Sequence, residues 1–281
     1  MLPNTGRAAD VTALRALGPG FDPSVVATID ARLREIAERE RVALLLAVES
    51  GSRAWGFPSP DSDYDCRFIY TRRRDDYLAL FPPRDVIELP VDVVLDVNGW
   101  DLAKALRLLL KGNAVVIEWL TSPHVYAGDA TFRDEMLALA QQAVRPAAIA
   151  RHYLHLGDRQ RRTYFADAHA VPIKKIFYAL RPAVALRWLR LHPGEAVAPM
   201  HFPTLIGTSE LPADVRVIVD DLLARKAIAS ELGSGLLPSP IGHLIDAEFA
   251  LARQLWQEEP WRPDPTNLAA ADDMFRRWTI H

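Results

Sequence analysis

Closely spaced aspartates mark the segment ESGSRAWGFPSPDSDYDCRFIY, which covers residues 49–70. Asp61, Asp63 and Asp65 occupy alternate positions, and neighbouring carboxylates repel one another unless a cation lies between them. Because side chains in a strand alternate between faces, Asp63, Asp65 and Arg67 share one face and leave the other apolar. Carboxylates without histidine or cysteine favour Mg²⁺ or Mn²⁺. Two such ions about 4 Å apart are the usual clamp for in-line phosphoryl displacement.

A Gly-Ser pair, Gly51 and Ser52, ends the apolar run that precedes these aspartates. Glycine allows close backbone approach, and exposed N–H groups with a hydroxyl suit phosphate oxygens. Taken alone, Gly-Ser is an ordinary turn and Asp-x-Asp is more often a solvated face. The combination of apolar strand, Gly-Ser, spacer and acidic strand favours a site for metal and phosphate. Arg53 and Arg67 can neutralise phosphate charge, although Arg67 can equally form an ion pair with one of the aspartates.

The stretch VDVVLDV at residues 91–97 carries two further aspartates. Asp92 and Asp96 fall on the same face of this stretch, so alternation does not choose between them. Asp101 is interpreted instead as an acid at a helix N-terminus, where the dipole stabilises negative charge.

The predicted elements change character along the chain. Up to about residue 130, a helix at residues 23–40 after Asp22 is followed by strands at 41–50 and 62–70, an extended region at 85–98 interrupted at Pro90, and helices at 99–112 and 114–120. Beyond it, helical periodicity dominates, at residues 132–144, 147–165, 172–191, 213–232 and 240–256, with a last short helix at 271–278. The fold class is therefore α/β, and the predicted domains are an N-terminal extension 1–21, a catalytic domain 22–130, a helical domain 131–260 and a tail 261–281.

The composition limits the class of protein and the cellular compartment that are compatible with this chain. It has 281 residues, 49% of them hydrophobic, a formal charge of −3 and a single cysteine. One cysteine allows no internal disulfide framework, and no apolar run reaches the roughly 18 residues of a membrane span. The N-terminus lacks a signal-peptide pattern, so we expect a cytoplasmic protein. The net charge excludes a strongly basic nucleic-acid coat protein but not a local basic groove.

The motif GSRAWGFPSPDSDYDCRFIY resembles the signature of the polymerase-β-type nucleotidyltransferase superfamily. The similarity continues through DVNGWDLAKALRLLLKGNAVVIEWLTSP and IKKIFYALRPAVALRWL, and together these blocks resemble the RNA-ligase-associated branch linked to RNA repair. The resemblance implies a short mixed sheet followed by an all-helical domain, a divalent metal, and ATP or another nucleoside triphosphate as substrate. The resemblance also implies a third acid from a neighbouring strand as metal ligand, and it favours Asp96 over Asp92 for this role. Lys174, Tyr178 and Arg181 recur at i, i+4 and i+7 of a predicted helix. They form either a cationic and aromatic wall beside the nucleotide, which the resemblance favours, or a solvated face.

The expected activity is metal-dependent transfer of a nucleoside monophosphate to an acceptor hydroxyl, with release of pyrophosphate. Asp63, Asp65 and Asp96 would be the catalytic and metal-binding residues, with Gly51 and Ser52 on the phosphates. Family association suggests an RNA end as acceptor. The alternatives are transfer to a protein or small molecule, and a nucleotide-binding sensor or partner protein without turnover.

Two further sequence features, the basic clusters and a histidine pair, each have a functional and a structural interpretation. Basic clusters at residues 71–77 and 158–162 can contact an RNA backbone, or they can be solvated loops and helix faces. His152 and His155 form an H-x-x-H pair, with His169 further on, but a zinc site needs further ligands at compatible spacing.

Overall fold

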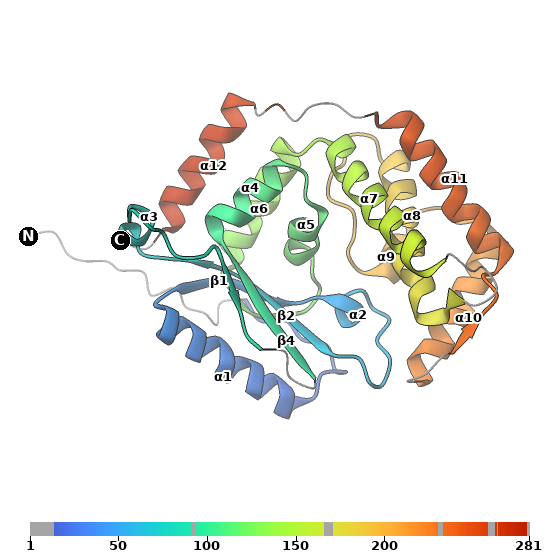
Figure 1. The fold of residues 1–281 in the computed structure, drawn as a ribbon, viewed down its shortest axis with the longest axis horizontal. Coiled ribbons are helices and arrows are strands. Elements are labelled where there is room, and N and C mark those ends of the chain that lie inside the picture. Colours follow the sequence, from blue (N-terminus) through green and yellow to red (C-terminus); the bar gives the residue numbers. More distant parts are fainter. Residues whose placement is uncertain are drawn as a thin grey trace, which may run out of the picture.

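A five-stranded mixed sheet forms the centre of the N-terminal half (Figure 1). The computed structural model describes residues 14–90, 94–165, 171–229, 233–257, 262 and 264–279. The strands lie in the order β3-β4-β2-β1-β5, with these bounds: β1 Ala43–Glu49, β2 Tyr64–Thr71, β3 Val86–Glu88, β4 Leu95–Asp101 and β5 Val125–Gly128. β2 and β4 are parallel and the other neighbouring strands are antiparallel, which confirms the mixed sheet.

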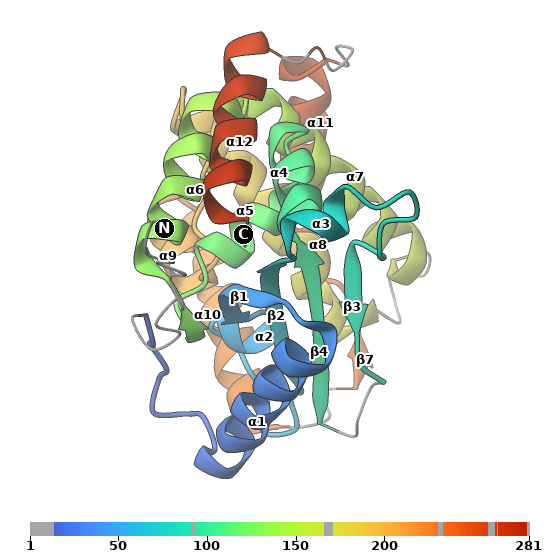
Figure 2. The ribbon, with the colours of Figure 1, turned by 90° about the vertical axis from the view of Figure 1, so that its left-hand side faces the viewer.

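Helix α1 (Pro23–Glu40) covers one face of this sheet, below it in Figure 2. The side chain of Asp22 accepts a hydrogen bond from the Ser24 N–H and caps the helix. Its buried residues Val26, Ile29, Leu33 and Ile36 recur at helical spacing and belong to the same apolar cluster as Cys66 and Phe68 of β2. The predicted helix and the predicted apolar face of β2 are both confirmed.

The opposite face of the sheet is covered by α4 (Leu102–Leu110), α5 (Ala114–Leu120) and α6 (Ala130–Ala143) (Figure 2). Asp101 caps α4 by accepting from the Ala103 N–H, as predicted for a helix N-terminal acid. The helix begins later than the predicted residue 99 because Gly99 and Trp100 pair with β3. The predicted extended region 85–98 is in fact divided between the antiparallel strands β3 and β4. Residues 91–93 lie outside the described residues.

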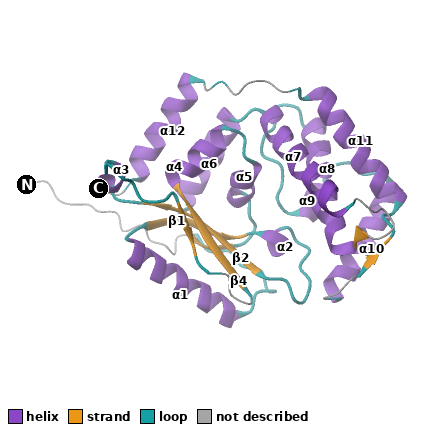
Figure 3. Ribbon diagram, in the orientation of Figure 1, coloured by secondary structure: helices purple, strands orange, loops and turns teal. Residues whose placement is uncertain are grey.

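The C-terminal half is built mainly of helices (Figure 3). α8 (Ile173–Leu191) is buried on nearly all sides and packs against α7 (Pro146–Tyr164) and α11 (Ser239–Leu255). Two more helices of this half are α9 Phe202–Gly207 and α10 Ala213–Ile228. The prediction of an all-helical second domain was wrong in one detail, because β6 (Val171–Pro172) and β7 (Ser234–Gly235) form a short antiparallel ladder.

Three further helices complete the fold. α2 (Gly51–Ala54) and α3 (Arg74–Tyr77) are single turns at the ends of β1 and β2. α12 (Pro265–Trp278), longer than the predicted 271–278, returns to pack on α4 and α6. One apolar cluster extends from α4–α6 into α7, α8 and α11, and the predicted domain boundaries at residues 21, 130 and 260 stay a prediction. No helix within the described residues is both long and apolar enough to cross a bilayer.

Candidate active site

The predicted acidic face of β2 points away from α1 and meets the neighbouring strand β4. The parallel register places Asp65 opposite Asp96, so their side chains share one face of the sheet. Arg67 lies between them: its Nη2 is 2.9 Å from Asp65 Oδ1 and 2.6 Å from Asp96 Oδ2. Its Nη1 also donates to the Asp96 carbonyl at 2.8 Å. The ion-pair interpretation of Arg67 is therefore the one observed.

The pKa of Asp65 is raised, first by burial and then by the charges of Asp96 and Asp63, while Arg67 and Arg53 oppose this effect. A carboxyl group that is costly to ionise alone is one that a bound cation stabilises. The guanidinium of Arg67 supplies part of that positive charge in the described conformation.

The Gly-Ser turn lies directly against the acidic strand. Gly51 has φ of +59°, and a Cβ at this position would lie 2.0 Å from Asp65 Oδ2. The Ser50 N–H donates to the Asp65 carbonyl at 2.8 Å, which fixes the turn to β2. Only glycine provides both the left-handed conformation and the space for Asp65, so the turn and the carboxylate form one unit.

A pocket of about 530 Å³ opens above this unit. The sheet side of the pocket is lined by Gly51, Ser52, Asp63, Asp65 and Arg67. Trp55 and several residues of the loop 57–62 also line this side. The helical side is lined by Lys174, Tyr178 and Lys226. Its volume is typical of a small-molecule site, and its two walls carry opposite charges. Below, it is called the central pocket.

Most of the predicted binding residues reach the central pocket. Ser52 lines it, with its Oγ 2.9 Å from that of Ser62. Lys174 reaches in from α8, and its Nζ lies 3.3 Å from Asp61 Oδ2. Tyr178 packs edge-on against Trp55 with ring centroids 5.9 Å apart. Lys174 and Tyr178 therefore lie on the wall of the pocket, and their contact with a nucleotide stays a prediction.

Arg53 and Arg181 do not line the central pocket. The Arg53 guanidinium donates to the carbonyls of Ser62 and Asp63 at 2.8 and 3.2 Å and lies 3.9 Å from the Tyr64 ring centroid. It holds the loop before Asp63 and faces a neighbouring cleft.

The expected contact of Arg181 with a nucleotide is not supported. Arg181 is 3% exposed, and its Nη2 pairs with Glu118 Oε1 at 2.7 Å. Its guanidinium lies 4.6 Å from the Trp55 ring centroid, behind the pocket wall. The helical spacing and the resemblance placed Arg181 on a stripe with Lys174 and Tyr178, whereas α8 is buried on nearly all sides and Arg181 forms an ion pair with the buried Glu118 carboxylate.

Two functional candidates were missed from the sequence. Glu49, fully buried at the end of β1, accepts hydrogen bonds from the Asp65 N–H at 2.9 Å and from the Tyr126 hydroxyl. Burial raises its pKa to about 7. It supports Asp65 from behind. No local pattern identifies it, because it stands at the end of an otherwise apolar strand.

Lys226 of α10 is 5% exposed, and its Nζ donates to the Phe57 carbonyl at 2.7 Å. Burial, and next the charge of Lys174, lowers its pKa to about 8. A signal was present in the sequence: Val215, Val219, Leu222 and Lys226 recur at helical spacing, and all four are buried. A lysine that continues an apolar stripe of a helix is expected to be buried, and a buried lysine needs a hydrogen-bond or charge partner.

The donor set suits Mg²⁺ or Mn²⁺, since Asp63, Asp65 and Asp96 offer hard carboxylate oxygens. Within the described residues no three such side chains converge on a common point, and Arg67 pairs with two of the three acids. The missing Cβ of Gly51 leaves the space that the Asp65 carboxylate occupies, so the turn allows this acid to lie against the backbone N–H groups beside the pocket. The alternative ligand Asp92 lies outside the described residues.

The histidine pair forms no metal cluster in the described part of the chain. His152 is partly buried, and burial lowers its pKa, while His155 is exposed. His169 lies outside the described residues.

Comparison with known proteins decides the family. Residues 25–277 match the RNA repair pathway DNA polymerase beta family, RlaP. The chain belongs to this family. It is also 40% identical over 217 residues to "Uncharacterized protein YcgL" of Bacillus subtilis (strain 168), covering 77% of this chain and 82% of that protein. Membership of the RlaP family agrees with the suspected polymerase-β-like branch and indicates nucleotidyltransferase chemistry in a setting of RNA repair.

Proposed function

We propose that this chain transfers a nucleoside monophosphate from ATP or another nucleoside triphosphate to the hydroxyl of an RNA end, releasing pyrophosphate. The observation that carries the proposal is the contact of the Gly51 turn with Asp65 at the floor of a pocket whose facing wall holds Lys174 and Lys226. Backbone N–H groups, carboxylates and ammonium groups around one cavity match a triphosphate with its counterions. The RNA acceptor is supported by the family.

Each residue then has a defined task. The Gly51 backbone and Ser52 orient the terminal phosphates, and Lys174 and Lys226 neutralise their charge from the helical side. Tyr178 and Trp55 supply an aromatic surface for the nucleobase. Asp63, Asp65 and Asp96 would hold Mg²⁺ or Mn²⁺, which when bound neutralises the triphosphate and lowers the pKa of the acceptor hydroxyl. Asp96 is the candidate general base for that hydroxyl proton.

One observation favours a second function, a nucleotide-binding sensor without turnover. Arg67 pairs with both Asp65 and Asp96 and takes the position between them that a cation would have. In a sensor this arrangement would persist with the nucleotide bound, whereas in a transferase Arg67 turns toward the phosphates.

The test offers each α-labelled nucleoside triphosphate with Mg²⁺ or Mn²⁺ to RNA ends, tRNA and the protein itself. Label on RNA that is lost in Asp63→Asn, with folding of the variant retained, supports the transferase. Metal-dependent nucleotide binding without transfer to any acceptor supports the sensor. Full activity of Asp63→Asn contradicts the proposed roles of the carboxylates.

A further inference from the structure

Basic and aromatic side chains alternate along the helical half, starting from the wall of the central pocket. Tyr178 lines that pocket, and Lys175 Nζ lies 4.5 Å from the centroid of its ring. The same Nζ lies 4.8 Å from the ring of Tyr164, the last residue of α7. The next residue, Phe165, lines a second cavity. Three aromatic rings and one lysine thus connect the two cavities.

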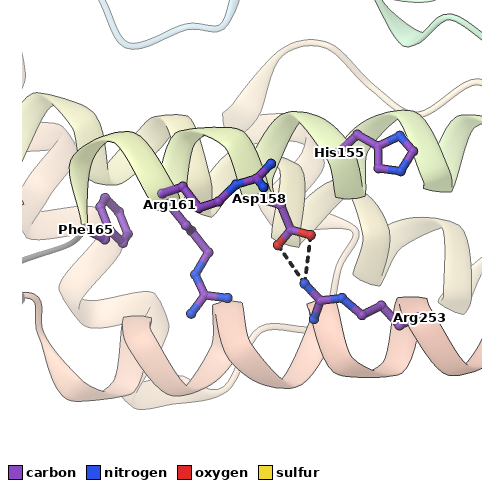
Figure 4. Close-up of a pocket in the computed structure, with 6 residues that line it drawn as sticks. His155, Asp158, Arg161, Phe165 and Arg253 are labelled. Carbon is purple, nitrogen blue, oxygen red and sulfur yellow. Dashed lines mark hydrogen bonds and ion pairs between the residues drawn. The ribbon is translucent and has the colours of Figure 1, made fainter.

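The second cavity is an open groove of about 850 Å³ between α7 and α11 (Figure 4). Three arginines and one aspartate contribute to its lining, together with an exposed histidine and Phe165: His155, Asp158, Arg161, Arg162, Phe165 and Arg253. Figure 4 shows the Asp158 side chain on α7 meeting Arg253 on α11, with an Nη2–Oδ1 distance of 2.7 Å.

Helix packing explains only part of this positive charge. Asp158 is matched by Arg253, and Arg161 is matched by Asp246 of α11. These two pairs join the helices and leave no net charge. Arg162 and Lys175 pair with no carboxylate among the residues that the structure describes, and Arg162 is exposed. The surplus positive charge therefore lies on Arg162, exposed in the groove, and on Lys175, half-buried between the rings of Tyr164 and Tyr178.

We propose that this row, from His155 and Arg162 through Phe165, Tyr164 and Lys175 to Tyr178, binds single-stranded RNA and leads its end to the central pocket. Single strands are recognised by cations that contact phosphates and by aromatic rings on which bases stack, and the row provides both in alternation. Along α7, His155 and Tyr164 are about 14 Å apart, so this part of the row is long enough to contact several phosphates of one strand. Duplex RNA presents no unstacked bases to the rings. The inference rests on the proposed function, since it supplies the RNA acceptor.

The first experiment measures binding directly, without turnover. A fluorescently labelled single-stranded RNA of about a dozen nucleotides is titrated with the full chain between about 50 and 200 mM salt. The double variant Arg162→Ala, Lys175→Ala is compared with Arg32→Ala, Arg276→Ala, which removes the same charge from surface ion pairs on α1 and α12. We expect binding about tenfold weaker in the first variant, and a slope of log affinity against log salt smaller by about 1.4. The control stays within about twofold.

A second variant separates stacking from charge. Tyr164→Leu keeps the helix end apolar but removes the ring, so affinity falls by about fivefold or more with the salt slope unchanged. Circular dichroism verifies that each variant is folded. Equal binding by the wild type and the double variant, or an equal loss in the control, overturns the inference, as does a wild type that binds no single-stranded RNA.

The outcomes also distinguish this inference from the proposed function. If label is transferred to RNA and the double variant has an unchanged KM for RNA, the transferase stands and the RNA row is refuted. If RNA binding depends on the row but no label is transferred to RNA, the row stands and the transferase fails.

Discussion

We predict that the buried ammonium group of Lys226 lowers the free energy of unfolding, and that its positive charge contributes to nucleotide binding. Its pKa falls from 10.5 to about 8 on folding, mainly through burial. The full shift corresponds to about 3 kcal/mol against the protonated form. Water in the central pocket screens part of this cost, and Lys226→Met also leaves the Phe57 carbonyl without its donor, a loss of about 1 kcal/mol. We therefore expect Lys226→Met to be more stable by about 1–2 kcal/mol near neutral pH.

The pH dependence of stability tests the direction of this effect. Below about pH 8 the lysine is protonated in both the folded and the unfolded chain, so the wild type carries the full cost. Between pH 8 and 10.5 the folded chain releases the proton before the unfolded chain does, and the cost declines. The stability gain of Lys226→Met should therefore shrink as the pH rises through this window. Urea unfolding of both proteins at about pH 7 and about pH 9.5 measures the difference.

Function should change in the opposite direction. Loss of one ammonium contact to the triphosphate costs about 1.5–3 kcal/mol, so the Kd for ATP should rise at least tenfold. Lys104→Met is the matched control, since Lys104 pairs with Asp85 on the surface and does not line the central pocket. A variant that is less stable than the wild type at neutral pH, or that binds ATP normally, would refute the reasoning.

Three further predictions concern the support of the site. Gly51→Ala places an alanine in the left-handed conformation, at a cost of about 1–2 kcal/mol, and displaces the Asp65 carboxylate. Nucleotide transfer should therefore fall at least a hundredfold while thermal unfolding still shows a folded protein, and normal transfer would contradict the proposed role of this contact. Arg181→Met leaves the buried Glu118 carboxylate without its cationic partner, although the Tyr153 hydroxyl still donates to it, and should cost about 3–5 kcal/mol. Glu118→Gln should recover most of this loss in a double-mutant cycle, and additive losses would argue against the pair. Asp101→Ala removes the cap of α4 and should lower the free energy of unfolding by about 1 kcal/mol, with no change in urea m-value.

Much of the acidic site followed from local rules. Alternation predicted that Asp63, Asp65 and Arg67 share a face; Asp65 and Arg67 lie on one face of β2, whereas Asp63 precedes the strand. The pairing of Asp65 with Asp96 depends on the parallel register of two distant strands. Alternation did not choose between the candidates on β4; the resemblance favoured Asp96, and the structure places Asp96 beside Asp65. The cap residues were predictable because a side-chain oxygen before a helix has a local partner.

The residues that sequence reasoning misplaced depend on contacts between distant segments. Arg181 was assigned to an exposed stripe, because nothing in its own helix reveals that Glu118 lies buried beside it. Glu49 receives its hydrogen bond from Tyr126, on a strand that was not predicted at all. β5 has only four residues, too few for a periodic pattern to indicate a strand.

The pairing of β1 with β5 also determines when the site can form during synthesis. The two strands are separated by more than seventy residues, so the sheet that carries the carboxylates closes only after the chain has been made as far as Gly128. Domains fold as they leave the ribosome, and non-local strand pairing is slow. Lys174 and Lys226 arrive later still. Arg67, by contrast, is made together with Asp65 and before Asp96, so the side chain that pairs with both acids is present in the chain before the sheet closes.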